Sequence, residues 1–260
     1  VCVTGLVVVD TFSYWSLFGK GVILILIQIG GLGIVSIITL FMLLFRMKIT
    51  LKSTMLLQDA FNLNSKQGLL KFTIKVIKGT FLIEGIGAFI YSFYYCREYG
   101  LLKGIWFSVF HAVSAFCNAG LDIMGADSLI PYHSNLLMML NTSFLIIMGG
   151  IGFIVWWDTV EAFRRIRTKK CSIRSAWNGV HLQTKIAIFM TLLLLIGGTV
   201  VIYFLERSNP DTLGNLSEKD RILNAFFQSV TLRTAGFAAV PQAALRPVTA
   251  FFGALLMMIG

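Results

Sequence analysis

FHAVSAFCNAGLDIMG, residues 110–125, decides the fold, because the apolar run that leads into it stops too early to cross a bilayer. The 13 residues of 104–116 would form a helix of about 20 Å at ~1.5 Å per residue. The hydrocarbon core of a membrane is ~30 Å thick. The run then breaks at Asn118-Ala119-Gly120 and meets an acid at Asp122. We therefore predict a re-entrant helix that enters the membrane and returns to the same side through a turn.

The rest of the chain is apolar enough to supply full membrane spans. Of its 260 residues, 57% are hydrophobic and only 13% are charged, and the mean hydropathy is +0.81. A soluble domain would carry ~25% charged residues. We predict an all-α polytopic membrane protein embedded in a lipid bilayer. Its expected long spans are 21–45, 79–95, 132–157 and 186–205.

The net charge of +10 is distributed in a way that orients the chain. Seven lysines and arginines lie in 46–78 and seven more in 164–185, which together are 14 of the 22. Basic loops beside membrane spans mark the cytoplasmic side, and most acids fall in the alternate loops. We therefore expect no nucleic-acid partner.

The four cysteines stand far apart and contain no CxxC pair, so they indicate neither a disulfide framework nor a zinc site. They are Cys2, Cys96, Cys117 and Cys171.

An internal repeat organises the sequence. FHAVSAFCNAGL (110–121) aligns without gaps on FFQSVTLRTAGF (226–237), and the opening VCVTGL ends in the same register. The aligned glycines Gly5, Gly120 and Gly236 are 115 and 116 residues apart. A second landmark repeats as well, since LIQIGGLGI (26–34) matches LIIMGGIGF (145–153). Parallel repeats of this kind generate pseudo-symmetry about the membrane normal.

Each unit reads as an outer helix, a short pore helix, a glycine-containing filter loop and an inner helix, the arrangement of potassium channels. The expected segments are 1–45 (filter loop and inner helix of repeat 1), 46–71 (cytoplasmic loop), 72–163 (complete repeat 2), 164–184 (basic cytoplasmic loop) and 185–260 (repeat 3, truncated in its inner helix). We take the chain to be a fragment that ends within repeat 3.

The turn after each short helix has the chemistry of an ion filter. Carbonyls that replace an ion's hydration shell must all point at the pore, which requires backbone angles that residues with a Cβ resist. The carboxyl end of the preceding helix favours a cation at the turn. Outer-mouth acids, Asp10 and Asp122, would raise the local cation concentration. The expected filter residues are Val3, Thr4, Gly5, Asn118, Ala119, Gly120, Thr234, Ala235 and Gly236.

At these residues the chain resembles the Ktr/Trk/HKT superfamily of potassium transporters, most closely its bacterial Ktr branch. The motifs are VTGLVVVDT with LIQIGGLGI, FHAVSAFCNAGLD with GGIGF, and FFQSVTLRTAGF, in order along nearly the whole chain. The resemblance implies four repeats around one pore and passive potassium uptake, often helped by sodium. It also implies a homodimeric subunit of the cell membrane, in bacteria the inner membrane, gated by a cytosolic ring of nucleotide-binding RCK subunits that would dock on the basic loops.

Three alternatives remain at this point. The first is a sodium-preferring or non-selective member of the same family, which Gly5 argues against because a serine there goes with sodium selectivity in the plant branch. The second is an intramembrane enzyme that uses Glu84, His111 or Asp158, and the third is a scaffold without transport. The acids and the histidine do not recur between repeats, whereas the glycines do, and no convergent catalytic group is visible. We therefore expect no enzymatic activity, no cofactor in this chain and no bound metal besides the transported potassium.

Several polar groups are expected to have structural roles. Glu84 should hydrogen-bond to a neighbouring pore helix, since a lone charge inside a span is costly. His111 should be buried and hydrogen-bonded, and Arg233 should point outward to pair with an acid or cap its helix. Asp158 and Glu161 should pair with the neighbouring arginines.

Two further segments are expected to serve packing. The glycines of 30–33 and 149–152 should allow close approach of helices. The stretch 50–62 should form an amphipathic connecting helix with Thr50 as its N-cap.

Overall fold

The computed structural model describes residues 11–33, 66–125, 128–169 and 172–259. The segment predicted at 50–62 and the first filter turn therefore lie outside the described residues. Within them the elements are α1 (Thr11–Tyr14), α2 (Leu17–Leu32), α5 (Lys66–Tyr99), α6 (Leu101–Phe116), η1 (Ile130–Tyr132), α7 (Leu136–Gly150), α8 (Phe153–Lys169), α9 (Ile173–Asn178), α10 (Leu182–Glu206), η2 (Pro210–Gly214), α11 (Glu218–Thr231), η3 (Gln242–Ala244) and α12 (Pro247–Ile259). This all-helical architecture confirms the predicted fold class.

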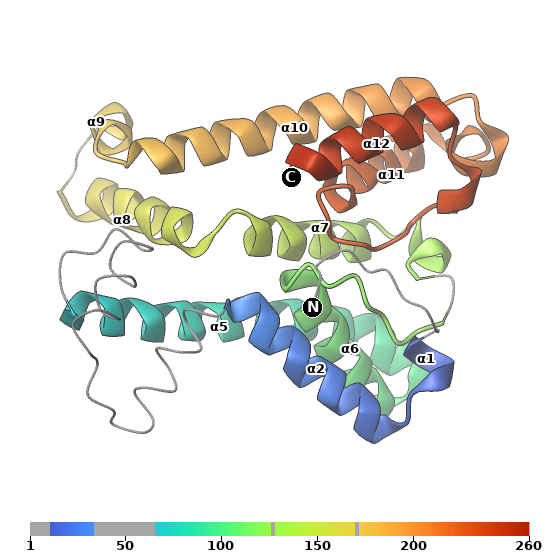
Figure 1. The fold of residues 1–260 in the computed structure, drawn as a ribbon, viewed down its shortest axis with the longest axis horizontal. Coiled ribbons are helices and arrows are strands. Elements are labelled where there is room, and N and C mark those ends of the chain that lie inside the picture. Colours follow the sequence, from blue (N-terminus) through green and yellow to red (C-terminus); the bar gives the residue numbers. More distant parts are fainter. Residues whose placement is uncertain (1–10, 34–65, 126–127, 170–171, 260) are drawn as a thin grey trace.

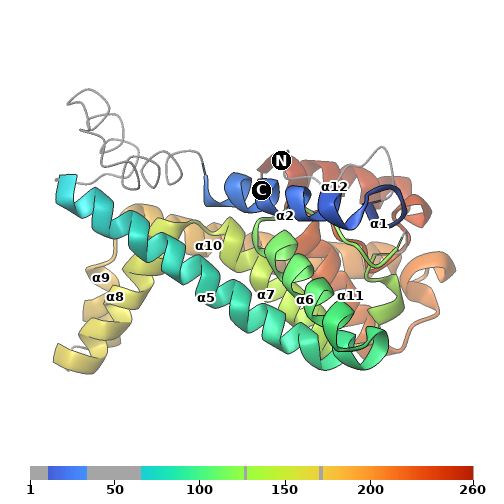
Figure 2. The same cartoon turned by 90° about the horizontal axis from the view of Figure 1, so that it is seen from below.

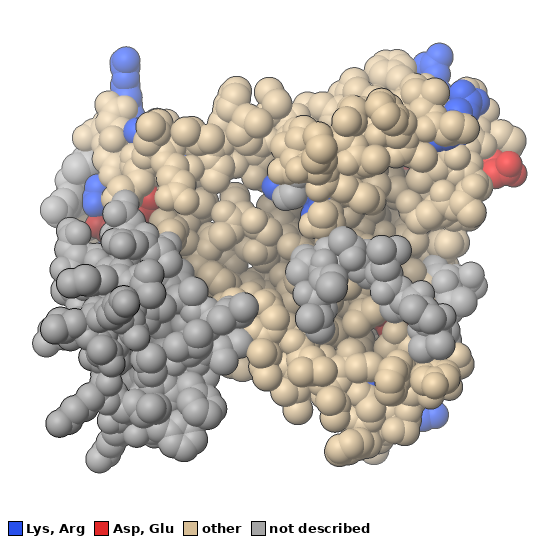
Figure 3. Space-filling model, viewed as in Figure 1, with Lys and Arg blue, Asp and Glu red and all other residues tan. Residues whose placement is uncertain are grey.

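Two helices are long and apolar enough to cross a membrane by themselves: 73–99 within α5 and α10. Both were expected as spans, and both extend beyond the expected bounds. In Figure 1 they run along the long axis of the molecule, with α7 and α8 between them. Most of the charged side chains on the face in Figure 3 lie away from the middle of that axis, which is largely uncharged.

The inner helix of repeat 2 differs from the prediction of one continuous span over 132–157. It is divided into α7 and α8, whose axes are bent by 101° at the break. Gly152 lies in this break with φ +92°. Glycine enters this left-handed region without the strain that a Cβ would add, so the chain can change direction here.

The glycines of each motif have two roles: some allow close packing of helices, and the last one ends a helix. A Cβ on Gly31 would collide with the side chain of Cys117, and one on Gly149 would collide with the carbonyl oxygen of Phe116. Both inner helices therefore pack tightly against the end of α6, as expected. The last glycine of each motif does something else: Gly33 (φ +78°) ends α2, and its equivalent forms the bend described above.

The predicted re-entrant helix is α6, which has 16 residues rather than 13. Its last turns are the most buried part of the molecule, and every residue of 110–116 is buried. It packs along α5 and also contacts α2 and α7. In Figure 1 its counterpart in repeat 3, α11, lies on the other side of α7, and it packs against α10. The two short helices thus lie at the centre, with the long helices outside.

Candidate functional site

The turns that follow α6 and α11 have the same unusual backbone. Asn118 and Gly120 have φ of +50° and +65°, and Thr234 and Gly236 have φ of +64° and +84°. The alanine between each pair has negative φ, since it is absent from the positive-φ residues of the described chain. Residues that align in the sequence repeat therefore also share their backbone conformation.

Thr234 is the strongest sign of strain in these turns. Asn tolerates the left-handed region because its short side chain bonds locally, but a β-branched residue there is a true outlier. Such conformations cost of order 1–3 kcal/mol and persist only where the surroundings over-determine them. Their presence at the same place in two repeats points to a functional constraint on the turn.

The two turns meet backbone to backbone. A Cβ built on Gly120 would lie 2.5 Å from the carbonyl oxygen of Ala235 and 2.6 Å from the Cα of Gly236. Real Cβ atoms do not come this close to backbone atoms. The structure thus brings together two of the three predicted turns, Asn118–Gly120 and Thr234–Gly236. The third, with Val3, Thr4, Gly5 and the acid Asp10, lies outside the described residues.

A hydroxyl from the preceding helix holds each turn in place. The Oγ of Ser114 donates to the carbonyl of Leu121 at 2.5 Å and accepts from the amide of the same residue at 3.0 Å. The Oγ1 of Thr231 donates to the carbonyl of Phe237 at 2.7 Å. Leu121 and Phe237 are equivalent residues, each directly after the filter glycine. We call these two contacts the hydroxyl braces.

Sequence reasoning did not find the braces, although a signal exists. Ser114 and Thr231 are hydroxyl residues in the last turns of α6 and α11, six and five residues before the glycine. The offset differs by one, so an ungapped alignment does not place them on each other.

The residue three places before the glycine differs between the turns. It is Cys117 in repeat 2 and Arg233 in repeat 3. Arg233 does not point outward to an acid as expected: it lines a cavity of about 200 Å³ with Asn118, Thr234 and Gly150. Within the described chain, its buried Nε and the Oδ1 of Asn118 have no hydrogen-bond partner. The turn of repeat 3 therefore carries a fixed positive charge beside it.

Asp122, the expected outer-mouth acid, follows the first turn directly and is half-buried. It lies close enough to Tyr95 to interact with it electrostatically. It is therefore engaged with the protein as well as near the turn.

Glu84 and His111 had been considered for catalysis. The carboxylate of Glu84 accepts from Gln28 at 3.0 Å and faces the thiol of Cys117 at 3.9 Å, at the end of α6. This confirms the expected bond to a pore helix. His111 is buried, but the expected hydrogen bond is wrong, since neither ring nitrogen has a partner within the described residues. Its ring instead packs against Tyr91 and Phe237, with centroids 4.8 Å away in both cases.

The predicted ion pairs of α8 are half right. Glu161 pairs with Arg165 at 2.7 Å. Asp158 accepts from His181 at 2.8 Å and from Thr184 at 2.6 Å instead, so it fastens α8 to the start of α10. In the part of the chain that the structure describes, no three metal-ligating side chains come together.

The outer segments of repeats 2 and 3 are bonded to each other. The amide of Leu129 donates to the carbonyl of Ala238 at 2.9 Å, and the amide of Ala238 donates to the hydroxyl of Ser128 at 3.4 Å. The side chain of Asn224, on α11, donates to the carbonyl of His133 at 2.9 Å. The two turns are thus joined at the mouth as well as where they touch.

The described residues thus contain two short buried helices whose turns, with matching positive φ, meet at the centre of an all-helical protein with membrane-spanning helices. Residues 1–260 match the model of TrkH, cation transport protein, so the chain belongs to this family of cation transporters.

Individual relatives narrow the comparison. The chain is 39% identical over 260 residues to the potassium/sodium uptake protein NtpJ of Enterococcus hirae, covering 100% of the chain and 54% of the relative. It is 39% identical over 258 residues to the Ktr system potassium uptake protein B of Bacillus subtilis, covering 99% and 55%. It is 33% identical over 260 residues to the protein of that name in Vibrio alginolyticus, covering 100% and 55%. The chain spans about half the length of these relatives.

Proposed function

We propose that this chain forms part of a potassium uptake pore, in which backbone carbonyls at the turns replace the hydration shell of the ion. The observation that carries the proposal is the contact between Gly120 and the Ala235-Gly236 backbone, at two turns with matching positive φ. Carbonyls from both turns can face one passage only if no side chain separates them. Conduction is passive in this proposal, and transport of the ion requires no covalent step.

The remaining ligands come from the other repeats. Val3, Thr4 and Gly5 would complete the filter from repeat 1, and a fourth repeat would supply the last set. Asp10 and Asp122 would concentrate cations at the mouth. The hydroxyl braces hold the turns in their strained form, so the cost of the geometry is met before the ion arrives.

A second candidate is a pore that also carries sodium, and the printed name of the Enterococcus hirae relative favours keeping it. One glycine per turn supplies fewer ordered carbonyls than a two-glycine filter, so discrimination by ligand number would be weaker. Gly5 in the first turn favours potassium. Sodium is then either a co-activator or a second transported ion.

We further propose that the whole protein is a homodimer of the cell membrane, in bacteria the inner membrane, with its basic loops on the cytoplasmic side. A cytosolic ring of nucleotide-binding RCK subunits would dock on 46–78 and 164–185. We propose no enzymatic activity, because Glu84, His111 and Asp158 are engaged separately and do not converge on one cavity.

The test is rubidium tracer uptake by the intact protein in a bacterial strain without its own potassium uptake, with and without sodium. Gly120→Ser should abolish uptake or change its selectivity at unchanged membrane level, since the new Cβ collides with the second turn. Gly197→Ser is the matched control, because a Cβ there meets nothing within 4 Å. Wild-type uptake and selectivity in Gly120→Ser would overturn the proposal.

A further inference from the structure

One face of α5 changes from apolar to basic within two turns. Leu82, Ile83, Gly79 and Lys75 share this face, because residues three, four, seven and eight apart lie together on a helix. Lys75 lies about 12 Å from Ile83 along the axis, at ~1.5 Å per residue. This basic end of α5 is the end at which the lysines and arginines of the chain gather. The face therefore has the polarity profile of a membrane lipid.

The bend at Gly152 leaves this face uncovered by α8 and by the other described helices. Because α8 turns by 101° from α7, it packs against α9 and α10 rather than along α5. Figure 2 shows the ends of α5 and α8 diverging at the same side of the molecule. A wedge opens between them.

Two cavities fill this wedge and share the walls Trp157 and Val160. We call the first the basic pocket: it measures about 590 Å³ and is lined mainly by Lys75, Arg164, Arg165 and Glu161 with the shared walls. We call the second the apolar groove: it measures about 490 Å³ and is lined by Gly79, Leu82, Val155, Ile188 and other residues, none of them charged. A space suited to a headgroup and a space suited to an acyl chain thus lie side by side.

The basic pocket contains more cations than its acid can pair with. Arg165 is committed to Glu161 at 2.7 Å and reaches the carbonyl of Gly179 at 3.4 Å. Lys75 lies over the ring of Trp157, 5.5 Å from its centroid, and neither it nor Arg164 has an acid partner within the described residues. An anion entering between them would meet two positive charges whose only acidic neighbour is already paired.

The indole of Trp157 stands at the junction of the two cavities. Its Nε1 has no hydrogen-bond acceptor in the described chain. A polar group that arrives at the junction would satisfy it once the ring turns. Trp at this depth is also the usual residue at the boundary between headgroups and acyl chains.

We propose that the wedge binds one anionic phospholipid of the cytoplasmic leaflet, with its phosphate between Lys75 and Arg164 and one acyl chain in the apolar groove. Basic pockets between membrane helices on that side attract anionic headgroups, and the leaflet itself is negatively charged. An acidic peptide or a free phosphate could bind the cations, but neither would fill the uncharged groove.

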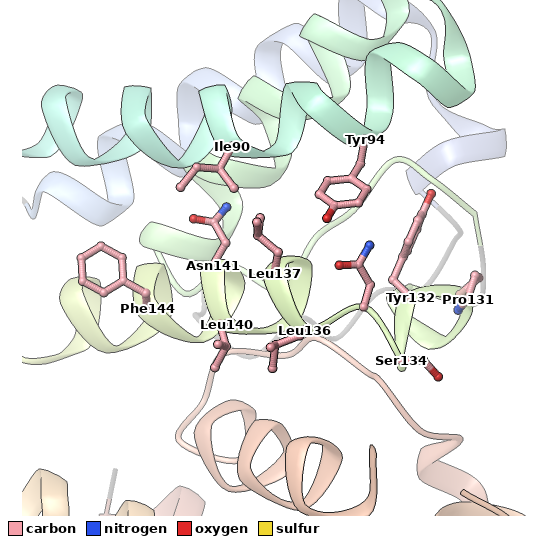
Figure 4. Close-up of a pocket in the computed structure, with 11 residues that line it drawn as sticks. Ile90, Tyr94, Pro131, Tyr132, Ser134, Leu136, Leu137, Leu140, Asn141 and Phe144 are labelled. Carbon is pink, nitrogen blue, oxygen red and sulfur yellow. The ribbon is translucent and has the colours of Figure 1, made fainter. Parts of the chain in front are cut away.

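A third cavity, which has no charged lining residue, serves as a comparison for the wedge. This outer groove, of about 930 Å³, lies between α5 and α7 and is lined by Tyr94, Tyr132, Asn135, Leu137 and Phe144 among others. Figure 4 shows its side chains, which include polar groups at one end and apolar groups along α7 but no charge. It offers an acyl chain a surface without selecting an anionic headgroup, so it provides an internal control.

The experiment is native mass spectrometry of the intact protein in mild detergent, titrated with dioleoyl phosphatidylglycerol or dioleoyl phosphatidylcholine. At about 1 kcal/mol for each cation near an anionic headgroup, K75Q/R164Q should weaken the tightest phosphatidylglycerol binding by about tenfold or more. Phosphatidylcholine binding, including that in the outer groove, should not change. Arg174→Gln removes an exposed cation of the same end, outside both cavities, and should leave phosphatidylglycerol binding as in the wild type.

A second variant tests the tail. Gly79→Leu places a side chain in the apolar groove, where a Cβ has its nearest neighbour at 3.5 Å, and should weaken phosphatidylglycerol binding while leaving both cations in place. Soluble glycerol phosphate should not compete with the lipid. Equal phosphatidylglycerol binding in wild type and K75Q/R164Q would overturn the proposal. Full competition by glycerol phosphate would do so as well, since it would show an anion site that makes no use of the groove.

Discussion

The turns after α6 and α11 have the same backbone conformation but different supports. Both place left-handed residues at the same two positions and both use a helix hydroxyl to hold the residue after the glycine. Their helices begin differently: the N-cap of α6 is Gly100, which makes no side-chain hydrogen bond, whereas the N-cap of α11 is Ser217, which accepts from the amide of Asp220. Cys117 and Arg233 differ at the same place beside the turn. The comparison teaches that the backbone of the turn is the constrained feature and that its flanks can vary.

The largest effect is expected at the glycines. Gly120→Ala adds left-handed strain of about 1–2 kcal/mol and a collision with the other turn. Gly236→Ala adds the strain of φ +84°. Rubidium uptake per membrane-inserted protein should therefore fall by more than about tenfold in Gly120→Ala. Gly236→Ala should also lower uptake, because of this strain. Wild-type uptake in both variants would show that the turns are not constrained in this way.

The hydroxyl braces should give the next largest effect. Thr231→Val and Ser114→Ala each remove a hydrogen bond worth about 1 kcal/mol and leave a buried carbonyl unpaired. Each should lower uptake several-fold and lower the Tm in detergent. Because the two turns touch, the double variant should deviate from additivity by at least about 0.5 kcal/mol. Strict additivity would mean that the turns act independently.

Ser92→Ala is the matched control for the braces. It removes a similar hydroxyl-to-carbonyl bond of 2.7 Å, to Phe89, on an exposed part of α5. Uptake and Tm should stay near the wild-type values. A loss as large as that of the braces would indicate a general effect of removing hydroxyls.

A smaller effect is expected where the repeats differ. Arg233→Gln removes a buried positive charge beside the turn, so rubidium uptake at low external concentration should rise by roughly two- to fivefold. Cys117→Ala removes only a weak contact to Glu84 at 3.9 Å and should change uptake little. Reduced uptake in Arg233→Gln at normal membrane level would show that the guanidinium supports the turn instead.

The smallest effect concerns the start of α11. A hydrogen bond from Tyr203 lowers the pKa of Glu218 below its ordinary value of 4.5. The carboxylate therefore stabilises the fold above that pH, and the contribution is lost as the pH falls through the lowered pKa. Glu218→Gln should make the Tm less sensitive to acid below about pH 4.5. Lys103→Gln, near the start of α6, should leave the acid sensitivity unchanged, because α6 has no acid in its first turn. Equal acid sensitivity in wild type and Glu218→Gln would contradict this role.

Length and periodicity were sufficient for the architecture. The short helix before Asn118, the spans within α5 and α10 and the register of Gly120 on Gly236 all follow from local patterns, so the sequence predicted them. The 101° bend at Gly152 could not be foreseen, because a glycine within an apolar run is compatible with either a straight helix or a break.

Side-chain partners were harder to predict than helices. The bond of Glu84 to the end of α6 was expected from the cost of a lone charge in a span. His111 was expected to have a hydrogen bond but lies among aromatic rings, and Asp158 prefers Thr184 and His181 to its neighbouring arginines. These outcomes depend on which elements approach from a distance in the sequence, and local spacing does not contain that information.

The bond between Leu129 and Ala238 has a mechanical consequence. It joins the rims of two repeats on the outer side, while their turns are in contact below. The two repeats are thus connected at two levels, by this hydrogen bond and by the contact between their turns. In the proposed pore, the passage between the turns could therefore widen only if both repeats moved together.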